Sequence, residues 1–332
     1  MQNLAIFRAM AAHPGNASAW PSCVAFHSMH KSAGLTFVTV LSHIVHQVLH
    51  GTLLKCEQQE WSWELKRCPD GGDVMASRQP RLLIKGHSLS MAATGPWMQP
   101  TCKWVTLFRE PISRSISAYF YCKLERPIDP LCGHTHFNFH NQSYGDFASF
   151  WSDFGFREML LHPALRGTAV DHFNATGLPT SRTSTWTGVP VWYAWKRAVT
   201  AAWGMGAALS EARFGAVKAA LEGGKLFDYI GVVERFDDTC RLLDTVLPLP
   251  PSVIARGDTF RKLASRLSSS HGSQRYKAQE LSTLASARQD PAVHASLSVD
   301  IQLYETVVLP MFDRQMTAVG LSAARSAPPT PS

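Results

Sequence analysis

The hydrophobic positions along the chain predict strands that alternate with helices. Short, almost continuous apolar runs occur at 23–27 (CVAFH), 81–85 (RLLIK), 104–108 (WVTLF) and 227–233 (FDYIGVV). Runs of this kind are typical of strands that are buried on both faces of a parallel sheet. We therefore expect these segments to lie side by side in a mainly parallel sheet.

Apolar residues at helical spacing follow or separate these runs. They occur at 35–49, 191–221, 234–247 and 298–316, and a further helix is expected from Pro111 to about Lys123. Proline suits the first turn of a helix, where its missing N–H is not needed. The alternation predicts an α/β fold, a three-layer sandwich with a mainly parallel central sheet. Ligands of such sheets bind at the carboxyl ends of the strands.

The chain is expected to form one large domain at 21–317, which its length of 332 residues allows. Residues 1–20 are expected to be a flexible amino-terminal tail and 318–332 a disordered carboxyl tail, because both are rich in small residues and the second also in proline. Residues 124–190 are rich in His, Pro, Asn and Thr, with a short amphipathic piece at 144–161. We expect this region to be loop-dominated and to contact the substrate.

The composition limits the classes of protein to which this chain can belong. Hydrophobic residues make up 45% of the chain and charged residues 17%, which excludes a disordered or fibrous chain. The formal charge of +7 favours an anionic partner. Basic residues are scattered and no aromatic RNA-binding motif occurs, so nucleic acid is not expected. No apolar stretch reaches the roughly 20 residues of a transmembrane helix, and 1–20 has no signal-peptide pattern, so no membrane anchor is evident.

The cysteines allow two interpretations. There are 7 of them, so at least one thiol is unpaired. Cys56 with Cys68 and Cys122 with Cys132 would close short loops, as in a protein of an oxidising compartment. Sequons for N-glycosylation stand at Asn16, Asn141 and Asn174. The alternative is that the cysteines are structural thiols and the sequons are fortuitous.

Two segments predict anion binding, and the first lies between strand 23–27 and its helix. It consists of His30, Lys31, Ser32, Ala33, Gly34, Leu35 and Thr36. Small residues let the backbone approach a ligand, and the N–H groups of a helix start favour a phosphate beside the charge of Lys31. The spacing of a nucleotide-hydrolysing P-loop is absent, so the loop is P-loop-like only in its physics. The alternative is an ordinary turn.

The second segment is 109–117 (REPISRSIS), directly after strand 104–108. Arg109 is expected at the carboxyl end of the strand, while Arg114 and Ser117 are one helical turn apart and would share a face that holds an anion. The alternative is a solvated helix terminus. Together the two segments suit a cofactor with phosphates at both ends.

In these motifs the sequence resembles the Golgi carbohydrate sulfotransferases that use 3′-phosphoadenosine 5′-phosphosulfate (PAPS), including the heparan sulfate 2-O- and 6-O-sulfotransferases. Their 5′-phosphosulfate loop, P-K-T-G-G-T-[ST], is similar to H-K-S-A-G-L-T here, although His30, Ala33 and Leu35 differ from it. Their 3′-phosphate motif, R-[DE]-P-x-x-R-x-x-S, is matched in full by 109–117. The segment 230–247 (IGVVERFDDTCRLLDTVL) and the D-x-x-L-Y pattern at 300–304 also look like that family, so the resemblance covers roughly 22–316.

The resemblance implies a role for each matching residue. Lys31 would contact the 5′-phosphosulfate and stabilise the charge that develops as the sulfuryl group leaves. The loop from Ser32 to Thr36 would bind the 5′-phosphate, and Arg109 and Ser117 would bind the 3′-phosphate. No metal is required.

The acceptor hydroxyl also needs a base, and histidine has a suitable pKa near neutrality. His87 follows strand 81–85 and looks similar to the histidine that follows this strand in the 2-O and 6-O enzymes. Glu57 and Glu60 are rival bases, and the alternative for His87 is a structural role. Further histidines stand at His134, His136 and His140, where an acceptor-binding loop or plain surface histidines are expected rather than a zinc site.

The expected function is transfer of a sulfuryl group from PAPS to a hydroxyl of a glycan, most simply an acidic polysaccharide, by a glycoprotein of the Golgi. Rival acceptors are a galactose 3-hydroxyl and a small molecule. A different alternative is a catalytically silent relative that binds a nucleotide or a glycan.

Overall fold

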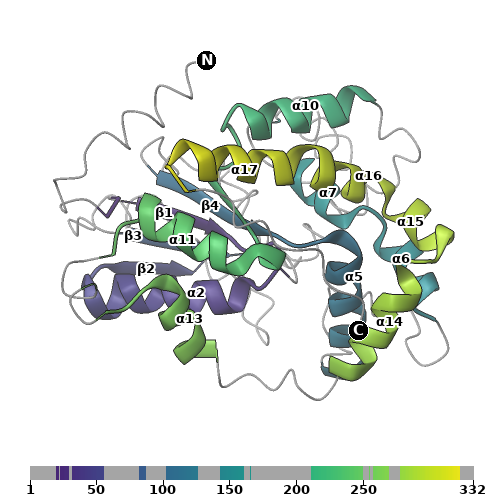
Figure 1. The fold of residues 1–332 in the computed structure, drawn as a ribbon, viewed down its shortest axis with the longest axis horizontal. Coiled ribbons are helices and arrows are strands. Elements are labelled where there is room, and N and C mark those ends of the chain that lie inside the picture. Colours follow the sequence, from purple (N-terminus) through teal and green to yellow (C-terminus); the bar gives the residue numbers. More distant parts are fainter. Residues whose placement is uncertain are drawn as a thin grey trace, which may run out of the picture.

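The computed structural model of the chain, shown in Figure 1, has a parallel β-sheet with helices around it. It describes residues 20–21, 23–29, 32–55, 82–86, 102–125, 143–160, 165, 211–249, 254, 257–268 and 277–321. No helix within these ranges is both long and apolar enough to cross a membrane.

The sheet has 5 strands in the order β2-β3-β1-β4-β5. Their bounds are β1 Cys23–His27, β2 Thr52–Lys55, β3 Leu82–Gly86, β4 Cys102–Phe108 and β5 Tyr229–Val232. Neighbouring strands pair in parallel throughout this sheet. The predicted α/β fold with a mainly parallel sheet is therefore confirmed. Strand β2 was not predicted.

The helical segments follow the predicted pattern with local differences. They are α2 Gly34–Ser42, α5 Pro111–Phe120, α6 Tyr144–Trp151, α7 Phe154–Leu160, α10 Glu211–Glu222, α11 Phe236–Val246, α13 Phe260–Ser268, α14 Lys277–Ala287, α15 Pro291–Ser296, α16 Ser298–Leu303 and α17 Leu309–Ala318. Shorter turns are the π-helical η1 His43–Val48, η2 Tyr121–Glu125 and η7 Tyr304–Val308, and the 3-10 turn η5 Val233–Arg235. The predicted helix 298–316 is thus confirmed with a π-helical middle, and it runs one residue beyond the expected domain end at 317.

Segments far apart in the sequence pack side by side. Helix α13 packs on α2 and helix α14 packs on α5, while α11 and α17 both contact β5 (Figure 1). Gly231 allows α11 to come close to β5, because a Cβ at this position would overlap Thr239 and the side chain of Leu107. The hydroxyl of Thr239 also bonds to the backbone N–H and C=O of Val232. These contacts hold the carboxyl end of β5 against the following helix.

A disulfide joins the first residues of β1 and β4, Cys23 and Cys102, which are 79 residues apart. This long-range pair was not predicted. Cys122 is also disulfide-bonded, to a partner outside the described residues. Cys56, Cys68 and Cys132 lie outside the described residues as well, so the predicted short loops stay predictions. Cys240 is free and buried, which agrees with the expected unpaired thiol.

The folded protein should lose stability in alkaline solution because it retains protons that the unfolded chain releases. Burial raises the pKa of the Cys240 thiol to about 12, assisted by Asp244 and Asp237, and burial with the charge of Asp228 raises the pKa of Tyr229 to about 12. Unfolded Cys and Tyr titrate near pH 8.5 and 10. The stability is thus fully present below about pH 8 and is lost as the pH rises toward 12.

We expect Cys240 and Tyr229 together to lower the free energy of unfolding by about 3 kcal/mol between pH 8 and pH 10.5, with Cys240 supplying the larger part. Urea unfolding at a series of pH values measures it. A Cys240→Ala variant should show a shallower decline, because Cys240 supplies most of the expected change. An equal slope in the two proteins would contradict this assignment.

Candidate anion-binding site

The junction between β4 and α5 is built by the residues that follow Phe108. Glu110 caps the helix, because its carboxylate accepts hydrogen bonds from the backbone N–H groups of Ile112 (3.1 Å) and Ser113 (2.8 Å). Pro111 occupies the start of the helix as predicted. The cap thus fixes the direction in which α5 leaves the sheet.

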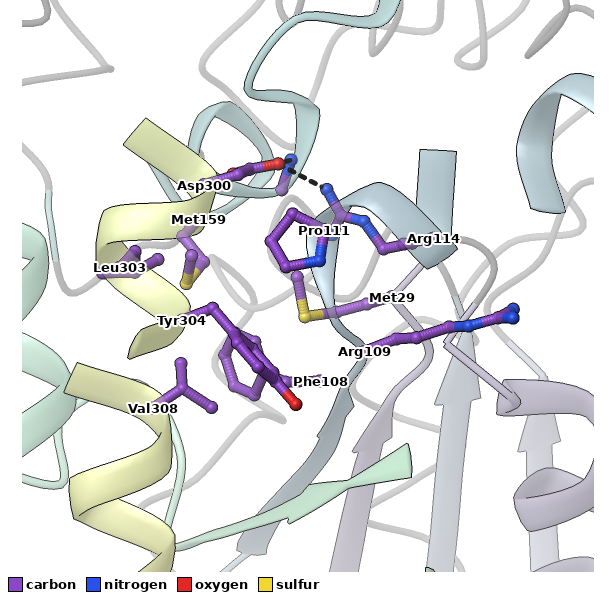
Figure 2. A pocket seen from close by; sticks show the side chains of 11 residues that line it. Met29, Phe108, Arg109, Pro111, Arg114, Met159, Asp300, Leu303, Tyr304 and Val308 are labelled. Carbon is purple, nitrogen blue, oxygen red and sulfur yellow. Dashed lines mark hydrogen bonds and ion pairs between the residues drawn. The ribbon is translucent and has the colours of Figure 1, made fainter. Parts of the chain in front are cut away.

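Arg109 stands at the carboxyl end of β4, as predicted, and is half-buried. Figure 2 shows its guanidinium pointing away from Arg114 and Asp300. Burial lowers the pKa of the Arg109 guanidinium below its ordinary value, while the carboxylates of Glu234, Glu280 and Glu110 act in the opposite direction. An arginine stays protonated in proteins, so Arg109 is a half-buried positive charge at this edge of the sheet.

Arg114 does not have the role expected from the sequence. Its guanidinium forms a 2.7 Å ion pair with Asp300, and both side chains are only 4% exposed. Asp300 also accepts the backbone N–H groups of Gly155 (3.1 Å) and Phe156 (2.6 Å). The prediction that Arg114 shares an anion-holding face with Ser117 is therefore wrong, because Arg114 is buried and its charge is matched. Ser117 itself is half-buried on α5.

Gly155 is required for this buried ion pair. A Cβ at position 155 would overlap the Arg114 guanidinium, so any other residue would displace one of the two groups. The start of α7 is thereby fitted to α5 and α16 through Arg114 and Asp300.

A small pocket marks the place where the separate segments meet (Figure 2). Its lining includes Met29 after β1, Arg109 after β4, and Asp300, Leu303 and Tyr304 of the D-x-x-L-Y pattern. It encloses about 10 Å³, roughly the space of one water molecule, so it is a junction rather than a nucleotide cavity. Two of the sequence motifs, 109–117 and 300–304, thus form walls of the same pocket.

Glu234 connects a third motif to this junction. It lies two residues after the end of β5, in the turn η5. One carboxylate oxygen accepts the backbone N–H of Glu110 at 3.1 Å, and the other accepts the hydroxyl of Tyr304 at 2.7 Å. Burial and the nearby Glu234 raise the pKa of Tyr304, so this hydroxyl stays a donor.

The loop between β1 and α2 lies next to the same edge. β1 pairs with β4, and the hydroxyl of Thr106 donates to the carbonyl of His27 at 2.8 Å. Ser32 is fully buried, and its hydroxyl has no hydrogen-bond partner within the part of the chain that the structure describes. Ala33 takes a left-handed conformation (φ 54°, ψ 20°) directly before α2. Such a backbone directs N–H groups toward the space before the helix.

The structure describes only some of the other predicted site residues. The backbone of Gly34, Leu35 and Thr36 forms the first turn of α2, and Thr36 is half-buried. Further predicted residues lie outside the described ranges, namely His30, Lys31, Glu57, Glu60, His87, His134, His136 and His140. His87 is the residue that follows the last residue of β3, a neighbour of β1.

Sequence reasoning singled out the segments that contain Asp300, Tyr304 and Glu234 but assigned these residues no role. One signal was present for Glu234, an acidic residue at the carboxyl end of a predicted buried strand, where ligands of parallel sheets bind. For Asp300 and Tyr304 no local signal exists, because their partners are 186 and 70 residues away.

No protein-family model matches the sequence, and no curated protein matches it either.

Proposed function

We propose that the protein is a sulfotransferase that moves a sulfuryl group from PAPS to a hydroxyl of a glycan. The observation that carries the proposal is the shared pocket wall of Met29 and Arg109, from the loops after β1 and β4. Met29 directly precedes the predicted loop 30–36 and Arg109 begins the predicted segment 109–117, so this shared wall supports a placement of both segments at one edge of the sheet. A cofactor with phosphates at both ends needs this kind of arrangement.

The loop after β1 would bind the 5′-phosphosulfate. Lys31 would supply the positive charge, and the backbone N–H groups from Ala33 to Thr36 would surround the phosphate with the hydroxyl of Ser32, whose own N–H donates to the carbonyl of Met29 at 3.3 Å. Two features support this role: the buried hydroxyl of Ser32 is unpartnered among the described residues, and Ala33 is left-handed. The resembled family has glycine at position 33, the residue that adopts this conformation most easily.

The segment after β4 would bind the 3′-phosphate. Arg109 offers a charge that points away from the buried ion pair, and Ser117 offers a half-buried hydroxyl on α5. The tight cap at Glu110 fixes the start of this helix. Arg114, the other arginine of the motif, is buried in its ion pair with Asp300, so the proposal assigns the 3′-phosphate to Arg109 and Ser117.

Sulfuryl transfer requires alignment of donor and acceptor and stabilisation of spread-out charge. The acceptor oxygen forms a bond to sulfur as the bond from sulfur to the bridging phosphate oxygen breaks. His87 takes the proton of the acceptor hydroxyl, and Lys31 stabilises the negative charge on the bridging oxygen. The scheme needs no metal, and Glu57 or Glu60 would replace His87 if the base lies elsewhere.

The parallel sheet would be the middle layer of a three-layer sandwich, and β1, its loop and α2 would be the P-loop-like 5′-phosphosulfate unit. The net charge of +7 suits an acidic polysaccharide as acceptor. The disulfide between Cys23 and Cys102 suits an oxidising compartment such as the Golgi lumen.

The first experiment is transfer of radiolabelled sulfate from PAPS to desulfated glycosaminoglycans, neutral galactosides and small phenols. We expect label on a polysaccharide with the wild-type protein and a loss of about 100-fold or more with Arg109→Ala, because a charged contact at the cofactor is removed. Arg314→Ala is the matched control, since Arg314 is exposed and pairs with Glu222 on the distant α10.

Each other result has a definite meaning. Label on a phenol alone would assign a small-molecule acceptor. Binding of adenosine 3′,5′-bisphosphate without transfer to any acceptor would indicate a catalytically silent relative. Absence of both binding and transfer would refute the proposal.

A further inference from the structure

We propose that Glu234 is a positioning residue that orients Arg109 for the 3′-phosphate, an inference that rests on the function proposed above. Glu234 belongs to none of the predicted phosphate-binding segments. Its carboxylate nevertheless holds the peptide that follows Arg109.

Glu234 forms a hydrogen bond to the backbone next to Arg109. The N–H of Glu110 belongs to the peptide group whose carbonyl carbon is that of Arg109, and it donates to Glu234 at 3.1 Å. This bond fixes the plane of that peptide. The Glu110 side chain fixes the same residue from the other side by capping α5. Arg109 therefore leaves the sheet from a backbone that is held at two points.

Glu234 also forms a hydrogen bond with Tyr304. The Tyr304 hydroxyl donates to the second carboxylate oxygen at 2.7 Å, and the tyrosine is 7% exposed. A carboxylate that accepts hydrogen bonds at both oxygens has little freedom to rotate. Tyr304 also lines the pocket beside Arg109. The D-x-x-L-Y pattern thus acts on the site through Glu234.

The negative charge of Glu234 also acts on Arg109. Glu234 is the carboxylate with the largest effect on the Arg109 guanidinium, ahead of Glu280 and Glu110. The two oxygens of Glu234 accept the Glu110 N–H and the Tyr304 hydroxyl, so its negative charge is held in place near Arg109. Glu234 therefore acts on Arg109 in two ways, through the hydrogen bond to the following peptide and through its negative charge.

Calorimetric titration with two nucleotides tests the inference. Adenosine 3′,5′-bisphosphate requires the Arg109 side of the site, whereas adenosine 5′-monophosphate lacks the 3′-phosphate. We expect Glu234→Ala to weaken bisphosphate binding about tenfold and to leave monophosphate binding unchanged. Glu234→Gln should restore most of the affinity, because its amide oxygen still accepts the Glu110 N–H. Tyr304→Phe should have a smaller effect in the same direction.

The control is Glu222→Ala, a partly exposed glutamate of α10 that pairs with Arg314. Equal losses for both nucleotides in Glu234→Ala, with a lower melting temperature, would assign Glu234 to general stability and overturn the inference. An unchanged preference for the bisphosphate in Glu234→Ala would also overturn it. A wild-type protein that does not distinguish the nucleotides would instead refute the 3′-phosphate site itself, and the inference with it.

Discussion

Replacement of Arg114 by alanine is expected to destabilise the protein by about 3 to 5 kcal/mol. The substitution leaves the Asp300 carboxylate, 4% exposed, without its ionic partner. The N–H groups of Gly155 and Phe156 still donate to Asp300, but they do not neutralise its charge. An unpaired charge in a low-dielectric interior is among the most costly defects of a folded protein.

Urea unfolding of Arg114→Ala, Asp300→Ala and the double variant measures this effect. The double variant should be less destabilised than the sum of the single variants, because removing both charges leaves neither unpaired. Arg241→Ala is the control: Arg241 is 47% exposed and pairs with Asp238, so its loss should cost less than about 1 kcal/mol. A loss at Arg114 no larger than at Arg241 would show that the buried pair contributes little.

Removal of the disulfide between Cys23 and Cys102 is expected to cost about 4 kcal/mol. The bond closes a loop with a sequence separation of 79 residues, and a long closed loop restricts the unfolded chain strongly. It also joins β1 and β4, the strands that lead into the two predicted phosphate-binding segments. We therefore expect a variant without this disulfide to lose stability, while the fraction that is still folded keeps its activity.

The Cys23→Ala/Cys102→Ala double variant isolates this bond, whereas a reductant would also cleave the disulfide of Cys122. Its urea midpoint should fall well below that of the wild-type protein. A Cys240→Ala variant controls for the loss of a buried cysteine side chain, because Cys240 forms no disulfide. Equal midpoints for the double variant and the wild-type protein would exclude a stabilising role.

Much of the sheet could be predicted because its strands are locally distinct. β1, β3, β4 and β5 are apolar runs with clear ends, and each was expected within a few residues of its observed bounds. β2 was missed because TLLK is only 4 residues long and directly follows a helical pattern. Hydrophobic periodicity does not detect so short a strand, because what defines β2 is its pairing with β3 in the folded protein.

The long-range contacts could not be predicted from local patterns. The spacing of Arg114 and Ser117, one helical turn apart, is typical of a surface anion site. Only the fold brings Asp300, 186 residues away in the sequence, next to Arg114 and neutralises its charge. The same limit applies to Cys102, whose partner is not the nearest cysteine along the chain. Spacing arguments favour short loops, whereas strand pairing in a parallel sheet joins distant residues.

For the candidate site, the sequence identified the segments that come together. It was less successful in assigning a role to each side chain. Arg109 was expected at the carboxyl end of its strand and is found there. The contact of Glu110 with Glu234 was not foreseen, because it depends on the pairing of β5 with β4. The bond from Tyr304 to Glu234 depends in addition on the packing of the carboxyl-terminal helices.

The disulfide also has a consequence for the order in which the chain matures. Cys56 and Cys68 precede Cys102 along the sequence, so both leave the ribosome while Cys23 still lacks its native partner. A thiol oxidised in order of synthesis would pair with one of them and close a shorter loop. Exchange through mixed disulfides must then bring Cys102 to Cys23 as β4 aligns beside β1. If Cys23 is oxidised early in this way, a disulfide isomerase should accelerate formation of the native Cys23–Cys102 bond.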